Sequence, residues 1–215
     1  MKILLSIATM LSTLFISYSQ KVDTIFNSET YKSYYSFDLK NPIIVSYTLY
    51  KGGGDCDRSH FYFKGNIFLK NRIATSSDYS HSGYDEGHMA NAEDFAYNCT
   101  FDESTFRFWN CVPQTPELNR GIWKTMENQV RILSQKDSIL VICGNIYNDK
   151  FIGNKVFVPV QCWKVVYSYT QKKIILSYIF TNSSSPNKTE IDVHTLNDII
   201  KSKYKIDFLK TMKLI

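Results

Sequence analysis

The alternation of apolar and polar positions predicts strands in both halves of the chain. Residues 43–50 are rich in β-branched and aromatic side chains, which is typical of a strand, and the glycines at 52–54 follow it as a turn. The apolar run 139–143 predicts a second strand in a central position of the sheet. The first of these strands lies well before the middle of the chain and the second well after it, so the sheet joins distant segments.

The last third of the chain predicts further strands and one helix. Residues 156–160, 164–169 and 174–180 each have strand-like composition, and the polar turn between the last two indicates a hairpin. Apolar residues then recur at near-helical spacing, which predicts a helix over 192–203 with a polar outer face. The order of elements favours a single α+β domain.

A helical stripe occupies the middle of the chain. Leu118, Ile122, Met126 and Val130 recur every four residues, which predicts a helix that begins near Asn119 and buries one side. Asn119 is a suitable N-cap, because its side-chain oxygen can accept a hydrogen bond from a free backbone N–H of the first turn. The same amide oxygen could instead bind a hard cation.

Glu127 follows Asn119 by eight positions. In a regular α-helix that separation is about 12 Å along the axis, so the two side chains would not both bind one ion directly unless the helix begins late. We therefore expect Asn119 to contact a cation and Glu127 to reach the waters around it.

Composition and charge narrow the class of protein. The chain has 215 residues, of which 44% are apolar and 21% charged, so it is expected to fold as one globular domain. Its net charge of +5 is too small to establish nucleic-acid binding.

The N-terminus has the pattern of a signal peptide. Lys2 precedes an apolar stretch over 3–16, and small Ser17 and Ser19 follow it. The stretch is shorter than the roughly 20 residues of a membrane span, although an uncleaved anchor is the alternative. We expect residues 1–19 to be removed, leaving a domain over 20–215 that is secreted or periplasmic and has no stable association with a membrane.

Export makes the five cysteines disulfide candidates. An odd number leaves at least one thiol unpaired within the chain. Cys99–Cys111 is the first pairing we expect, and Cys143, inside an apolar run, is expected to be a buried thiol.

Four blocks in the middle of the chain carry a resemblance to a known family. They are residues 85–88 (Asp-Glu-Gly-His), 110–114 (Asn-Cys-Val-Pro-Gln), 118–123 (Leu-Asn-Arg-Gly-Ile-Trp) and Glu127. In this order and spacing they resemble the DNA/RNA non-specific endonuclease family. The resemblance implies a ββα-metal (His-Me finger) core in a larger, mainly antiparallel sheet flanked by helices. It also implies cleavage of DNA and RNA as substrates without sequence preference, with Mg²⁺ as cofactor and Mn²⁺ as a possible substitute.

The resemblance assigns roles to individual residues. His88 matches the general base, and a neutral imidazole can take a proton from water near neutral pH. Asn119 matches the one direct protein ligand of the metal, and Glu127 matches a catalytic carboxylate that acts on the metal through water. Asn110 matches a further position at the site, where it would support the substrate by hydrogen bonding or only stabilise its own turn.

Glu86 departs from the family pattern, which has Arg or another cation at this position. A carboxylate near a phosphate is repulsive unless it is protonated, metal-bound or turned away. Arg58 and Arg120 are the cations expected to bind substrate in its place, although each could simply be a salt-bridged surface residue. The competing function is a nucleic-acid-binding relative in which Glu86 has weakened or abolished catalysis.

Overall fold

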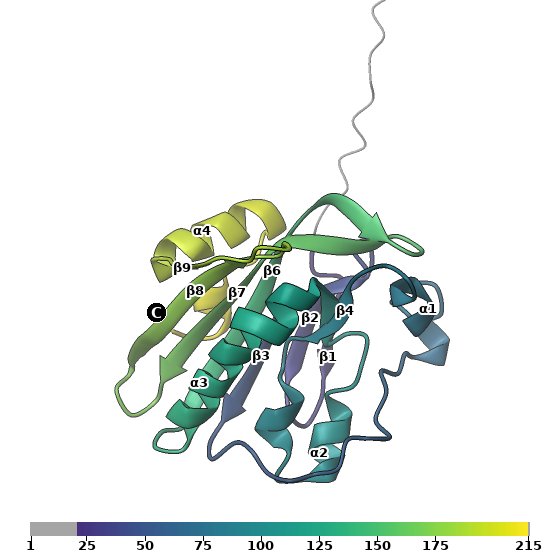
Figure 1. The fold of residues 1–215 in the computed structure, drawn as a ribbon. Helices are drawn as coiled ribbons and strands as arrows, with labels where there is room; N and C mark the ends of the chain where they lie inside the picture. Colours follow the sequence, from purple (N-terminus) through teal and green to yellow (C-terminus); the bar gives the residue numbers. More distant parts are fainter. Residues whose placement is uncertain (1–20, 215) are drawn as a thin grey trace, which may run out of the picture.

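The computed structural model describes residues 21–214, so the predicted signal peptide lies outside the described residues. A seven-stranded antiparallel sheet in the order β1-β2-β3-β6-β7-β8-β9 forms the centre of the molecule (Figure 1). Its strands are β1 (Thr24–Asn27), β2 (Lys32–Ser36), β3 (Asn41–Leu49), β6 (Ile139–Ile152), β7 (Val156–Ser168), β8 (Lys173–Thr181) and β9 (Lys188–Glu190).

The predicted strands are confirmed, except that two of them form one continuous strand. The apolar run 139–143 begins β6, which is the middle strand of the seven. The segments predicted over 156–160 and 164–169 form the single strand β7. Polar Gln161 interrupts the apolar pattern without interrupting the ladder, because it pairs with Ile146 on β6 and with Thr181 on β8.

Each face of the sheet is covered by a helix (Figure 1). Helix α3 (Lys124–Ser134) packs Met126 and Val130 into one cluster of buried residues with alternate side chains of the sheet. Helix α4 (Val193–Tyr204) packs Leu196 and Ile200 into a second cluster on the opposite face, as the predicted helix over 192–203 requires. The two apolar faces account for the near-continuous burial of the central strands.

A second, two-stranded sheet lies beside α3. It consists of β4 (Asp85–His88) and β5 (Cys111–Gln114), which pair antiparallel. Two strands followed by a helix give the ββα arrangement of the α+β fold class that was expected. The remaining elements are α1 (Ser76–Tyr79), α2 (Cys99–Ser104), α5 (Phe208–Thr211), the 3₁₀ turns η1 (Ile67–Leu69) and η2 (Ala92–Phe95), and a π-helical segment η3 (Leu118–Trp123).

The prediction that Asn119 caps a helix is wrong. Asn119 lies inside η3, and Gly121 leaves the helical conformation (φ −104°, ψ −113°), so regular α-helix begins only at Lys124. The backbone N–H of Asn119 donates to the Thr115 carbonyl at 2.9 Å, and that of Leu118 donates to the Thr115 hydroxyl at 3.3 Å. Thr115 thus satisfies the start of the helical segment and leaves the Asn119 side chain free for other contacts.

The predicted Cys99–Cys111 pairing is also wrong. Cys99 bonds to Cys56, whereas Cys111 is a buried thiol whose Sγ lies 3.6 Å from the Tyr79 hydroxyl. Cys143 is buried and free, as expected. Between residues 21 and 214, no helix has the length and apolar character needed to cross a membrane.

Candidate active site

The β4–β5 hairpin places the first two sequence blocks side by side. Across the ladder Asp85 faces Gln114 and His88 faces Cys111. Gly87 is required between them, because a Cβ at this position would collide with the Gln114 side chain. The indole N–H of Trp123 donates to the His88 carbonyl at 3.3 Å, which fixes the start of α3 against the hairpin.

Asn110 holds the loop that follows β4. Its Oδ1 accepts from the Ala90 N–H at 2.9 Å, and its Nδ2 donates to the carbonyls of Ala90 and Thr105 at 3.0 and 2.9 Å. The residue is fully buried. Asn110 therefore supports the backbone around the site, and the expectation of a direct substrate contact is corrected, because it exposes no amide atom.

His88 lies between aromatic rings at the end of β4. The ring centroids of Phe63 and Phe106 are each 4.6 Å from that of the imidazole. Burial, with a smaller contribution from the Arg58 charge, lowers the pKa of His88 from 6.5 to about 3. Its Nε2 is buried and accepts no hydrogen bond from any described residue. At neutral pH His88 is therefore an uncharged base with an unpaired nitrogen.

A cavity of about 640 Å³ opens beside the π-helical segment and α3. Four cations line it: Arg58, Arg120, Lys124 and Arg131. Its other lining residues are the carboxylates Glu93 and Glu127 and the amides of Asn91, Asn119 and Asn128. The cavity thus joins three segments that are distant in sequence, and its cations outnumber its carboxylates.

Asn119 and Arg120 are both held by Asp85. The Asn119 Nδ2 donates to Asp85 Oδ2 at 3.0 Å, and the Arg120 guanidinium donates to both carboxylate oxygens at 2.8 and 2.6 Å. Burial alone would raise the pKa of Asp85, but these hydrogen bonds outweigh it and lower the pKa. With its nitrogen bound to an ionised carboxylate, the amide of Asn119 has its oxygen free to bind a cation.

Glu127 is buried at the wall of the same cavity. Burial raises the pKa of its carboxyl, whereas Lys164 and a hydrogen bond with Asn91 act in the opposite direction. The Lys164 Nζ lies 3.9 Å from Glu127 Oε1 and 4.2 Å from the centre of the Trp123 ring. Lys164 was not predicted from the sequence, although a lone lysine inside the apolar strand pattern of 163–166 indicates a buried partner.

Arg58 connects the cavity to His88. Its guanidinium forms an ion pair with Glu93 and lies 3.8 Å from the carboxylate of Asp102, which is fully buried. Burial raises the pKa of Asp102 to about 6, because the opposing effect of the Arg58 charge is smaller. The expected substrate cations Arg58 and Arg120 thus both line the cavity, and each is also paired with a carboxylate of the chain.

Glu86 lies outside the wall of this cavity, on the face of β4 that also carries His88. It faces Pro113 across the ladder, is half-buried and does not line the cavity. Burial and, to a smaller extent, the neighbouring Asp85 raise its pKa. Glu86 therefore places no charge in the wall that Asn119 and Glu127 share.

The oxygen donors fit a hydrated hard cation rather than a closed metal site. No group of three or more His, Cys, Asp or Glu side chains is placed to hold a metal within residues 21–214. The oriented amide of Asn119 and the carboxylate of Glu127 nevertheless line one cavity. Mg²⁺ commonly keeps several waters and takes only one or two protein oxygens, so this donor set suits it.

The chain is similar in sequence to a family of nucleases and to individual nucleases. The family model described as DNA/RNA non-specific endonuclease matches residues 13–212. A protein named nuclease from Nostoc sp. is 32% identical over 145 residues, covering 64% of this chain and 52% of its own length. Human mitochondrial endonuclease G is 31% identical over 130 residues, covering 54% of this chain and 43% of its own length. The chain thus spans about half the length of these curated relatives.

The fold also has a solved counterpart. A chain in the crystal structure of an EndoG/EndoGI complex superimposes with a TM-score of 0.72 and 26% sequence identity. The match covers 86% of this chain and 84% of that one. The similarity therefore extends over most of the fold.

Proposed function

We propose, because the chain belongs to the DNA/RNA non-specific endonuclease family, that it is a divalent-metal-dependent endonuclease that hydrolyses phosphodiester bonds of DNA and RNA. The observation that carries the proposal is the placement of His88. It is an uncharged base with an unpaired Nε2, and it lies near Arg58 of a cavity that also holds Asn119 and Glu127.

In the proposed reaction, the neutral imidazole of His88 accepts a proton from the water that attacks phosphorus. Its lowered pKa keeps one ring nitrogen free of a proton at neutral pH, and the two phenylalanine rings hold the imidazole in place. Arg58 and Arg120 offer guanidinium groups to the phosphate oxygens, a contact that a planar donor fork suits well.

Asn119 and Glu127 would hold the metal. Asn119 would contact the ion through Oδ1, and Glu127 would orient waters bound to it. A bound Mg²⁺ would neutralise charge on the phosphate and on the leaving oxygen. Asp85 and Lys164 are the residues that keep these two side chains in place.

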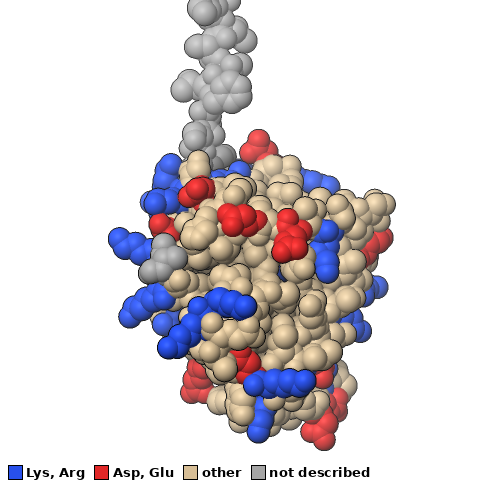
Figure 2. Space-filling view, turned by 90° about the vertical axis from the view of Figure 1, so that its left-hand side faces the viewer, with Lys and Arg blue, Asp and Glu red and all other residues tan. Residues whose placement is uncertain are grey.

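The binding-only alternative is not favoured, because Glu86 does not line the cavity. Lys and Arg side chains also form no single basic field on the face drawn in Figure 2, where they are spread among acidic residues. Charge recognition is assigned to the four cations that line the cavity. Secretion after removal of residues 1–19 is part of the same proposal and is supported by the sequence pattern alone.

The test compares wild type with His88→Ala on plasmid DNA and on RNA, in Mg²⁺ and in EDTA. Wild type is expected to cut both substrates only with the metal, and His88→Ala to lose most of this activity while keeping its far-UV circular dichroism. His194→Ala, an exposed histidine on α4, is the matched control and should cut normally. Normal cleavage by His88→Ala would contradict the assigned mechanism, and no cleavage by wild type would contradict the function.

A further inference from the structure

The segment that carries Arg58 is weakly connected to the rest of the fold. Apart from the ion pairs of the Arg58 side chain, its hydrogen bonds are local: the Ser59 N–H donates to Asp57 Oδ1 at 2.9 Å, and the Phe61 N–H donates to the Arg58 carbonyl at 3.0 Å. Across the described chain, no backbone hydrogen bond joins residues 54–60 to a strand or helix. A segment whose main chain is bonded only locally is free to move unless something else anchors it.

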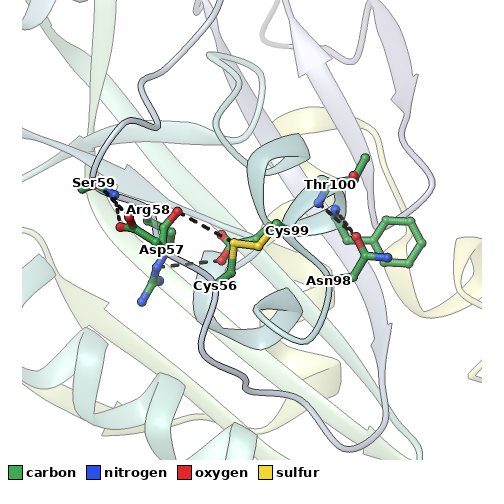
Figure 3. Close-up of a disulfide and its surroundings, with 9 residues drawn as sticks. Cys56, Asp57, Arg58, Ser59, Asn98, Cys99 and Thr100 are labelled. Carbon is green, nitrogen blue, oxygen red and sulfur yellow. Dashed lines mark hydrogen bonds and ion pairs between the residues drawn. A yellow bond between two sulfur atoms is a disulfide. The ribbon is translucent and has the colours of Figure 1, made fainter.

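The Cys56–Cys99 disulfide supplies that anchor (Figure 3). It joins the segment to the first residue of α2, across 43 positions of sequence. The first turn of α2 is itself fixed, because the Asn98 side chain accepts from the N–H groups of Thr100 and Phe101 at 2.9 and 3.3 Å. The disulfide therefore ties a weakly bonded segment to a capped helix.

Arg58 lies two positions after the anchored cysteine. One of its ion-pair partners, Asp102, is on the same short helix as Cys99, and the other, Glu93, lines the cavity with it. The disulfide and the Arg58 guanidinium thus both contact α2, the disulfide at Cys99 and the guanidinium at Asp102. Because Arg58 also acts on the charge state of His88, a shift of this segment would move a cation relative to the base.

We propose that the Cys56–Cys99 disulfide is a positioning element for substrate binding, which holds Arg58 where it can meet a phosphate of the nucleic acid. This inference rests on the proposed function, since it takes the substrate to be a phosphodiester. When the disulfide is reduced to two thiols, Arg58 is held only by its two ion pairs. A substrate phosphate competes with the carboxylates of those pairs for the guanidinium. Opening the bridge therefore weakens substrate affinity and leaves His88, Asn119 and Glu127 in place.

The experiment measures binding without cleavage. All proteins carry His88→Ala, and a fluorescein-labelled single-stranded DNA of twelve nucleotides is titrated in EDTA while its anisotropy is followed. The parent is compared with Cys56→Ser/Cys99→Ser, with Arg58→Ala and with the combination of the three substitutions. Circular dichroism and a thermal melt set a measurement temperature at which every variant is folded.

The paired cysteine substitution is expected to weaken binding about five- to tenfold, and to lower the salt dependence of the binding constant by about one counterion, as the loss of one phosphate contact does. Arg58→Ala should weaken binding at least as much, and adding the cysteine substitutions to it should change nothing further. Dithiothreitol should reproduce the loss in the parent, by transferring two electrons and two protons to the bridge, and should leave the cysteine variant unaffected.

Two results would overturn the inference. One is unchanged affinity in both the cysteine variant and the reduced parent. The other is a loss that adds in full to that of Arg58→Ala, since this would show a general effect on the fold. Cleavage by the protein with an intact His88 is measured in parallel. If that protein cuts DNA and the cysteine variant binds normally, only this inference fails; if it neither cuts nor binds nucleic acid, the proposed function fails and the inference with it.

Discussion

Replacement of Lys164 by methionine tests how the cavity wall is built. Lys164 is fully buried on β7, and its Nζ makes no hydrogen bond with a described residue. Its Nζ lies 3.9 Å from the Glu127 carboxylate and 4.2 Å from the centre of the Trp123 ring, and its charge also acts on the pKa of the Cys143 thiol, against the effect of burial. Methionine has a similar length and no charge, so Lys164→Met removes the ammonium and leaves most of the packing intact.

The size of the effect follows from the distance. Two unit charges 3.9 Å apart attract each other by about 4 kcal/mol at an effective dielectric constant near 20. Removal of one partner from a buried pair costs about 3–5 kcal/mol, because the other charge is left without compensation. We expect Lys164→Met to lower the free energy of unfolding by about this amount, and Glu127→Gln in the same chain to restore most of it.

The assay is urea denaturation at pH 7 of wild type, the two single variants and the double variant. A coupling energy of about 2–4 kcal/mol between the two positions is expected from this cycle. Lys173→Met, an exposed lysine on the neighbouring strand β8, is the matched control and should change stability by about 0.5 kcal/mol or less. A coupling energy below about 0.5 kcal/mol would refute the view that Lys164 compensates the charge of Glu127.

Three further predictions concern the residues around the cavity. Because unfolded histidine binds a proton below pH 6.5 while folded His88 does so only near pH 3, the native state loses stability as pH falls between these values. The unfolding free energy should therefore fall by about 3 kcal/mol less in His88→Gln than in wild type between pH 6.5 and 4. Parallel curves of unfolding free energy against pH for the two proteins would contradict the lowered pKa. Asn110→Ala should destabilise the protein by about 2–3 kcal/mol in urea, since it leaves the N–H and the carbonyl of Ala90 without partners, whereas the Thr105 carbonyl still accepts from the Arg107 N–H; a loss below about 1 kcal/mol would show that water replaces the amide. Asn119→Ala should leave the melting temperature nearly unchanged, because this side chain is no helix cap, yet remove the cleavage of plasmid DNA in Mg²⁺. A large drop in melting temperature with normal cleavage would reverse that assignment.

The large sheet was predictable where burial is continuous, and less so at its edges. Strands β3, β6 and β7 bury nearly consecutive side chains, most of them apolar, and composition alone indicates them. Strands β1 and β2 lie at one edge, and β2 has the polar sequence Lys-Ser-Tyr-Tyr-Ser, so periodicity does not distinguish them from a loop. The residues of β4 are chemically distinctive but too few to show a strand pattern.

The site was predictable as a set of residues and not as a set of contacts. The sequence blocks include Asn119, Arg120 and Glu127, and the structure lines one cavity with all three. The error on Asn119 arose because helical spacing was assumed to hold from Leu118 onward, whereas Gly121 breaks the helix and turns the amide toward Asp85. Lys164 comes from a distant strand, and pairings of that kind depend on the register of the sheet.

The register of β4 also explains how the chain tolerates Glu86. Successive side chains of a strand point to opposite faces, so Asp85 and Glu86 cannot both face α3. Asp85 is the one that binds Asn119 and Arg120, whereas Glu86 lies close enough to Tyr79 and Cys111 to add to the rise that burial causes in their pKa values. The cations of the cavity come instead from the segment of Arg58, from η3 and from α3. Under the proposed function, recognition of a phosphate would rest on those cations, and the carboxylate at position 86 leaves the wall of the cavity intact.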